Sequence, residues 1–241
     1  MTLKRVVHTL VARLLLFIFF TIFIIPFLII IFTPMKYRLQ SKFISILIYF
    51  FYWASLKCTL LPITYEGLEN IPDEPVIFAA NHQSSLDIPL VGKLAGYTPQ
   101  VWLATTYLLQ SPLLRVWVPR MAIMVDTSSP LQAMRSLVET IRVVEGTECH
   151  VIIFPEGQRF DDGHVHEFFG GFVILAKKLN RPIVPVCIIG ANKVYPRDTF
   201  WANWGPIRIV VGPAMEYRID DTDETYKQRV YQWFVDLVGE A

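Results

Sequence analysis

The chain has 241 residues, of which 53% are hydrophobic, which is enough for one substantial folded domain and an additional apolar segment. The formal net charge is +1, and no Lys- or Arg-rich run with interleaved aromatic residues occurs, so we expect no nucleic-acid partner. Cys58, Cys149 and Cys187 are far apart in apolar surroundings, which disfavours a disulfide framework or a thiolate metal site and favours a reducing compartment.

Two apolar segments lie near the N-terminus. The first, residues 11–32, is long enough to cross a hydrocarbon core of about 30 Å. A cleaved signal peptide is the alternative, but the run is too long and no small-residue cleavage site follows it. The second, residues 43–61, contains Ser45, Ser55 and Lys57 and is rich in Tyr and Trp, which is typical of a helix at the membrane interface.

The connector between these segments is basic, with Lys36, Arg38 and Lys42. If both segments crossed the bilayer, the connector would be translocated, against the tendency of Lys and Arg in short loops to stay on the cytoplasmic side. We therefore predict that residues 1–61 form a membrane-anchoring helical hairpin that enters and leaves on one face. Residues 62–241 would form the second domain.

Beyond residue 61, short apolar runs alternate with helical patterns. Continuous apolar strands indicate a sheet covered on both faces, hence an α/β fold with a mixed, mostly parallel sheet flanked by helices. The predicted strands are residues 76–80, 101–104, 122–125, 151–154, 183–189 and 207–211, and the predicted helices are residues 130–145, 169–179 and 226–239.

The first candidate site is Asn-His-Gln-Ser-Ser-Leu-Asp at residues 81–87, between the strand at 76–80 and a helix that opens at Asp87. A neutral imidazole at His82 can take the proton of an attacking hydroxyl if the Asp87 carboxylate holds its other ring nitrogen. The alternative is structural, because the same carboxylate could cap a free backbone N–H group near the start of the helix.

The second candidate site is Phe-Pro-Glu-Gly-Gln-Arg at residues 154–159, directly after another strand. Gly157 allows a tight turn beside a ligand, and the planar guanidinium of Arg159 suits phosphate oxygens. Glu156 could hold that guanidinium or an acceptor hydroxyl, although Pro-Glu-Gly is also ordinary turn chemistry. Both sites follow the carboxyl ends of strands, where open α/β sheets bind ligands.

Three stretches, in this order and spacing, resemble three of the four sequence blocks of the glycerolipid acyltransferases, whose best-known members are the 1-acylglycerol-3-phosphate acyltransferases. They are Asn81-His82-x-Ser84-x-x-Asp87, Phe154-Pro155-Glu156-Gly157-x-Arg159 and Ile183-Val184-Pro185-Val186. The resemblance covers roughly residues 62–215, and the N-terminal hairpin is similar to the membrane anchor of bacterial members.

The resemblance implies transfer of a fatty acyl chain from acyl-CoA or acyl carrier protein to the hydroxyl of a lysolipid, in phospholipid synthesis. His82 would be the catalytic base and Asp87 its orienter. The residues implied to bind substrate are Asn81, Ser84, Glu156, Gly157 and Arg159. No metal or bound cofactor belongs to this chemistry, and the implied location is a bacterial inner membrane with the active site at the cytoplasmic face.

The chain departs from the family pattern where cations are expected. Thr127 takes the place of Arg in the second block, Thr105 the place of a Lys, and Phe168-Phe169 the place of Lys residues. Phosphate monoester recognition depends on such cations, so another lysophospholipid or a lyso-aminolipid is the alternative acceptor. Arg115 and Arg120 could compensate, or could be exposed surface residues.

Other readings use the same residues differently. A serine hydrolase could use Ser84 or Ser85 near His82, but no Gly-x-Ser-x-Gly elbow occurs. A non-catalytic lipid-binding protein could share the fold, yet it would have no need for a base. His164 and His166 lie near acidic residues, and we expect them to be solvated loop residues more readily than metal ligands.

Overall fold

A seven-stranded sheet forms the centre of the computed structural model, which describes residues 2–112, 114–197, 199–239 and 241. The strand order is β1-β7-β6-β2-β5-β3-β4, and all neighbours are parallel except the antiparallel pair β6 and β7. The strands are β1 (Ile63–Glu66), β2 (Ile77–Ala80), β3 (Gln100–Thr105), β4 (Ala122–Val125), β5 (His150–Ile153), β6 (Ile183–Ile189) and β7 (Ile207–Val211). The predicted mixed, mostly parallel sheet is confirmed.

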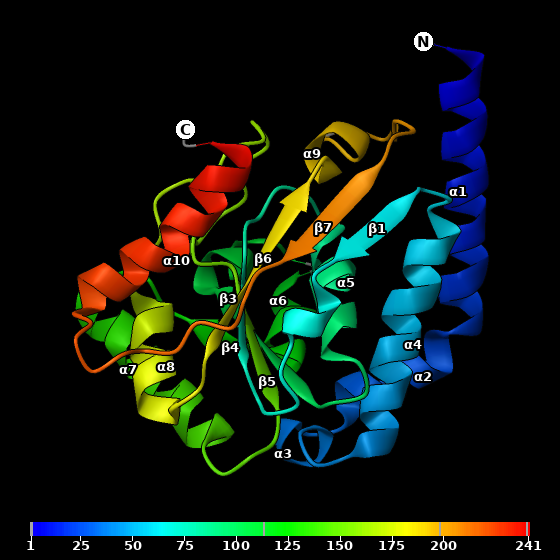
Figure 1. The fold of residues 1–241 in the computed structure, drawn as a ribbon. Helices are drawn as coiled ribbons and strands as arrows, with labels where there is room; N and C mark the ends of the chain where they lie inside the picture. Colours follow the sequence, from blue (N-terminus) through cyan, green and yellow to red (C-terminus); the bar gives the residue numbers. More distant parts are fainter. Residues whose placement is uncertain (1, 113, 198, 240) are drawn as a thin grey trace.

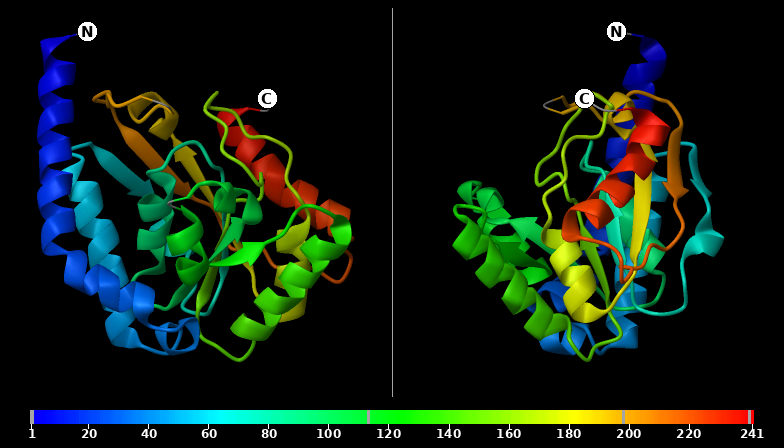
Figure 2. Two further views of the ribbon diagram at one scale, coloured as in Figure 1. Left: turned by 180° about the vertical axis from the view of Figure 1, so that it is seen from behind. Right: turned by 60° about the vertical axis from the view of Figure 1, so that its left-hand side comes forward.

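Helices cover both faces of this sheet, as Figures 1 and 2 show. The helices that follow β1 along the chain are α5 (Asp87–Gly92), α6 (Leu114–Met121), α7 (Pro130–Val144), α8 (Gly171–Leu179), α9 (Ala191–Val194) and α10 (Asp223–Val238), with short 3-10 turns at Leu68–Asn70, Lys93–Ala95 and Thr106–Gln110. Strand β2 explains the continuous apolar runs: Ile77 and Ala79 belong to a core under α7, α8 and α10, whereas Phe78 and Ala80 belong to the opposite core. Every residue of β2 is buried, so its sequence is apolar throughout and does not alternate between apolar and polar residues.

The six predicted strands are all present, with ends that differ by at most one residue. Strand β1 was not predicted, because it is a four-residue edge strand whose side chains alternate between half-buried and exposed. Helix α6 was also missed, since Pro119 interrupts its pattern and none of its described residues is buried.

Four helices precede the sheet: α1 (Leu3–Ile22), α2 (Ile24–Phe32), α3 (Met35–Arg38) and α4 (Lys42–Cys58). The predicted single segment at residues 11–32 is therefore wrong in detail, because the first helix begins at Leu3 and is interrupted at Phe23. Pro26 accounts for the break, since it has no N–H group for the carbonyl of Ile22 and its ring crowds that carbonyl.

Helices α1 and α4 lie side by side and run in opposite directions (Figures 1 and 2), joined by aromatic contacts. The ring of Phe51 in α4 lies 5.6 Å from Phe19 in α1 and 5.9 Å from Phe27 in α2, centroid to centroid. Helix α4 also packs on α5, where the buried Tyr52 fills the space beside Gly92. The N-terminal helices thus contact the sheet domain directly, and the division at residues 61 and 62 stays a prediction.

The outer surface of α1 and α2 is apolar, with exposed side chains that include Leu14, Phe17, Ile25 and Phe32. Among the described helices, α1 is the one that is long and apolar enough to cross a membrane, with a mean hydropathy of 1.9 over 18 residues.

Candidate active site

The two predicted site loops meet at the carboxyl ends of the central strands. Strand β2 pairs in parallel with both β5 and β6, so the loops after β2 and β5 and helix α9 after β6 lie at the same edge of the sheet. In Figure 1 this is the end toward which the arrow of β6 points. The backbone N–H of Phe160 donates to the carbonyl of His82 over 2.9 Å, which fixes one loop against the other.

His82 and Asp87 form the pair expected from their spacing. The imidazole Nδ1 lies 2.8 Å from the Asp87 Oδ2 atom, and the Asp87 side chain is fully buried. The same oxygen accepts the backbone N–H groups of Gln83 at 2.6 Å and Ser84 at 2.7 Å. The contacts expected under both interpretations of Asp87 are therefore present, because one carboxylate oxygen accepts the loop N–H groups and also contacts the imidazole. The catalytic role of the pair stays a prediction. A proton on Nδ1 leaves Nε2 with its lone pair.

The imidazole of His82 lies flat on the ring of Phe154, with centroids 4.0 Å apart and planes 8° apart. Its side chain keeps 15% of its surface accessible, whereas Asp87 keeps none. The aromatic stack and the Asp87 bond together fix the ring orientation, and the remaining exposure allows a substrate to approach.

Glu156 lies beside this pair and is 2% exposed. Its Oε2 atom accepts the backbone N–H of His82 over 3.5 Å, so the carboxyl group contacts the backbone of the His82 loop. Burial raises the pKa of Glu156 to about 8, and the nearby Asp87 contributes in the same direction. The carboxyl group is therefore largely protonated at neutral pH and can donate as well as accept a hydrogen bond.

Gly157 and Arg159 belong to the same loop. Gly157 has a φ of +72°, and a Cβ atom there would lie 2.9 Å from the ring of Phe169. The positive φ favours glycine, and a Cβ atom there would force the exposed Phe169 ring to move. Arg159 is half-buried two residues further on, and its contact with an acceptor stays a prediction.

Asn81 and Ser84 make contacts that the sequence did not indicate. The Asn81 amide donates to the carbonyl of Ile188 over 3.0 Å and accepts its N–H over 2.7 Å. The Ser84 hydroxyl donates to the carbonyl of Tyr195 over 3.2 Å. These bonds attach the loop to β6 and to the end of α9, so a contact with substrate stays a prediction for both residues.

The positions where the family pattern has cations differ in their surroundings. Phe168 is buried against the rings of Phe172 and Phe234, so this position belongs to the core under α10. Thr105 ends β3 and Thr127 follows β4.

The two arginines that could compensate are exposed on α6. Arg120 donates to the carbonyl of Val116 in its own helix and lies over the ring of Phe32. Arg115 is likewise exposed. Their surroundings are those of surface residues, so Arg159 is the cation that the two predicted site loops supply.

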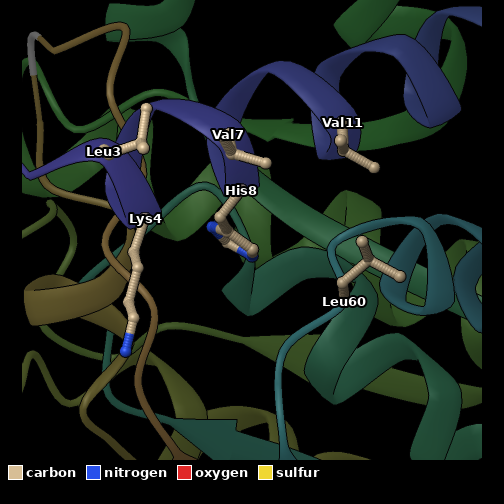
Figure 3. A pocket seen from close by; sticks show the side chains of 6 residues that line it. All are labelled: Leu3, Lys4, Val7, His8, Val11 and Leu60. Carbon is tan, nitrogen blue, oxygen red and sulfur yellow. The ribbon is translucent and has the colours of Figure 1, made fainter.

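Outside this site, no group of three or more His, Cys, Asp and Glu residues suited to a metal occurs within the described part of the chain. His166 pairs with Asp162 at 2.7 Å on the surface and stacks on Phe160. A shallow groove of about 430 Å³ lies at the start of α1 (Figure 3), where side chains of the helix face Leu60. It is lined by Leu3, Lys4, Val7, His8, Val11 and Leu60, and is therefore separate from the His82 site.

Comparison with known proteins gives one consistent family. Residues 62–189, more than half of the chain, match the family model described as Acyltransferase. A 1-acyl-sn-glycerol-3-phosphate acyltransferase of Pseudomonas aeruginosa is 33% identical over 164 residues, which cover 64% of this chain and 60% of that protein. One of Limnanthes alba is 31% identical over 171 residues, which cover 69% of this chain and 60% of that protein. The chain thus spans about 60% of the length of these relatives.

Among solved structures, the 1-acyl-sn-glycerophosphate acyltransferase PlsC from Thermotoga maritima superposes with a TM-score of 0.74. The match covers 98% of this chain and 97% of that chain at 22% identity, so it concerns the fold, the N-terminal helices included. Because the family model matches more than half of the chain, including the strands and loops that build the site, the chain belongs to the acyltransferase family.

Proposed function

We propose that this chain is a membrane-bound O-acyltransferase that moves a fatty acyl chain from acyl-CoA or acyl carrier protein to the hydroxyl of a lysolipid. The observation that carries the proposal is the His82–Asp87 pair, with a fully buried carboxylate at 2.8 Å from the ring, in a chain of this family. The relatives named above are 1-acyl-sn-glycerol-3-phosphate acyltransferases, which makes lysophosphatidic acid the first acceptor to test.

The chemistry follows from the free Nε2 of His82. As the acceptor oxygen attacks the thioester carbonyl carbon, Nε2 takes the hydroxyl proton and Asp87 stabilises the imidazolium. The tetrahedral intermediate then breaks its carbon–sulfur bond, and the leaving thiolate takes the proton from the imidazolium. The products are an ester and a free thiol, and His82 returns to its starting state.

The acceptor would lie against the loop of Glu156, Gly157 and Arg159. The guanidinium suits a phosphate, and a neutral Glu156 carboxyl can bond a hydroxyl without repelling that phosphate. Because Thr105, Thr127 and Phe168 provide no cation, Arg159 would hold the phosphate largely alone. This favours a second candidate, an acyltransferase for a lysophospholipid with a larger headgroup or for a lyso-aminolipid.

Membrane attachment is supported by the exposed apolar surface of α1 and α2 and by the separation of charge along the chain. Residues 1–65 contain cations but no Asp or Glu, whereas the whole chain has a net charge of only +1. Such a segment suits the anionic cytoplasmic leaflet of a bacterial inner membrane.

The test is transfer of a labelled acyl chain by purified protein in phospholipid vesicles, from acyl-CoA and from acyl carrier protein in parallel. Lysophosphatidic acid, other lysophospholipids and lyso-aminolipids serve as acceptors, and kcat/KM is compared among them. Transfer that disappears in His82→Ala supports the proposal. Release of free fatty acid without any acceptor would identify a hydrolase, and absence of turnover with every donor and acceptor would refute the enzyme.

A further inference from the structure

Helix α9 and the residues after it contact both catalytic loops. We name this region the α9 platform: Ala191–Val194 with residues 195–197 and 199–203. Its Tyr195 carbonyl accepts the Ser84 hydroxyl at 3.2 Å, on the loop of His82. Its Asn192 amide donates to the carbonyl of Asp161 at 2.9 Å, on the loop of Glu156. The platform is thus hydrogen-bonded to each loop that carries a proposed active-site residue.

The platform is closed on itself. The backbone N–H of Asn203 donates to the carbonyl of Val194 at 2.7 Å, and the Asn203 amide donates to the carbonyl of Lys193 at 2.6 Å. A displacement of its last residues is therefore transmitted to α9 and to the Tyr195 carbonyl.

Helix α1 holds those last residues with a polar stripe. Thr9 is fully buried, and its hydroxyl oxygen accepts the N–H of Ala202, which is also buried, at 3.2 Å. The same hydroxyl lies 2.8 Å from the Arg5 carbonyl of its own helix and 3.1 Å from the Ala202 carbonyl. Arg5 donates to the carbonyl of Trp201 at 3.4 Å, and Arg13 donates to that of Phe200 at 3.0 Å. Positions 5, 9 and 13 share one helix face, so these contacts form a single row.

We propose that Thr9 is a positioning residue for acyl transfer: through the α9 platform it sets the loop of His82, although it lies on the helix that we assign to the membrane. This inference rests on the proposed function. Valine has the shape of threonine but would leave the buried N–H of Ala202 without its acceptor, so the segment would shift to find another partner. A shift of about 1 Å in catalytic groups can cost about 100-fold in rate.

The experiment compares Thr9→Val with Thr9→Ser in vesicles of phosphatidylcholine and phosphatidylglycerol. The matched control is Thr21→Val, because the Thr21 hydroxyl bonds to Phe17 within the same helix and is exposed. We expect Thr9→Val to lower kcat by about 10-fold with an unchanged KM for the acyl donor and unchanged vesicle binding. Thr9→Ser keeps the hydroxyl and should retain the wild-type kcat, as should Thr21→Val.

A double-mutant cycle separates positioning from general loss of stability. If Thr9 acts through the platform, Ser84→Ala and Thr9→Val interrupt the same connection, and their combined loss of kcat is smaller than the product of the single losses. Arg13→Met, at a partly exposed contact, serves if Thr9→Val does not fold, and should lower kcat about 3-fold.

A wild-type kcat in the folded Thr9→Val and Arg13→Met variants would overturn the inference, as would full multiplicativity in the cycle. Loss of vesicle binding with normal kcat in detergent would also overturn it. The proposed function fails separately, if the wild-type protein itself transfers no acyl chain.

Discussion

Replacement of Asp87 by Asn tests how the carboxylate assists His82. Asp87 Oδ2 accepts three hydrogen bonds, from the His82 ring and from the backbone of Gln83 and Ser84. Asn could in principle turn its NH₂ group toward the imidazole and force the wrong tautomer. That orientation would set the NH₂ group against two buried backbone N–H donors, so the amide oxygen should take the place of Oδ2 instead.

The His82 tautomer is then preserved, and what is lost is the negative charge that stabilises the imidazolium. A charge-assisted hydrogen bond contributes about 1.5–3 kcal/mol, which corresponds to about 10- to 150-fold in kcat. The Asn NH₂ group would occupy the site of Oδ1, which has no hydrogen-bond partner within the described residues. Asn is preferable to Ala, which would also leave two buried N–H groups unpartnered at about 1–3 kcal/mol each.

The assay is kcat for acyl transfer by folded Asp87→Asn, with the imidazole tautomer read from nitrogen chemical shifts of labelled histidine. The matched control is Asp126→Asn. The Asp126 carboxylate also accepts a backbone N–H group, that of Ser128, but it does not belong to the proposed catalytic pair. A loss of about 10⁴-fold with the proton moved to Nε2 would refute the argument for the retained tautomer. A wild-type rate would refute any role of the Asp87 charge.

Four further predictions follow from the site and the N-terminal helices. His82→Ala should lower kcat for acyl transfer by about 10²–10⁴-fold or more. Its folding, measured by circular dichroism, and its vesicle binding, measured by flotation, should not change. Burial raises the pKa of Glu156 to about 8. Between the ordinary glutamate pKa and this value, the native state therefore holds one more proton than the unfolded state, and the free energy of unfolding falls as pH rises through this window. Glu156→Gln should therefore flatten the decline of Tm over this window. Gly157→Ala should lower the free energy of unfolding by about 1–3 kcal/mol, through its φ of +72° and the Phe169 ring, in denaturant titrations. A cysteine at position 36 should be protected from a membrane-impermeant reagent added to intact cells, because the hairpin is predicted to be monotopic.

Each of these has a contradicting outcome. Wild-type turnover in folded His82→Ala excludes the general base, and an unchanged slope of Tm against pH in Glu156→Gln excludes a proton held on that carboxyl group. Gly157→Ala with wild-type stability would mean that the Phe169 ring moves away at no cost. Ready labelling at position 36 from outside would mean that the connector is translocated.

The sheet and the contact between His82 and Asp87 were predictable because their signals are local. Strand β2 is apolar throughout since both of its faces are covered, and His82 and Asp87 are only five residues apart. The partners of Asn81 and Ser84 are 107 and 111 residues away, and no local pattern specifies a bond to a distant backbone carbonyl. By contrast, Arg5, Thr9 and Arg13 show a four-residue spacing in the sequence itself, but a predicted apolar segment that begins at residue 11 excludes the first two of them.

The contacts of the N-terminal helices bear directly on the topology of the proposed membrane attachment. At one end, α1 is bonded to the α9 platform as far as Arg13, which leaves residues 14–22, about 14 Å of helix, before the break at Phe23. At the other end, the ring of Phe27 lies 6.3 Å from Trp117 of α6, and Arg38 of the connector is buried and contacts Met121. A hydrocarbon core is about 30 Å thick, so residues 14–22, which pack on α4, are too short to cross it while both ends stay on the domain. In the proposed membrane attachment, the connector then lies on the same side of the bilayer as the His82 site, and the exposed side chains of α1 and α2 enter only the adjacent leaflet.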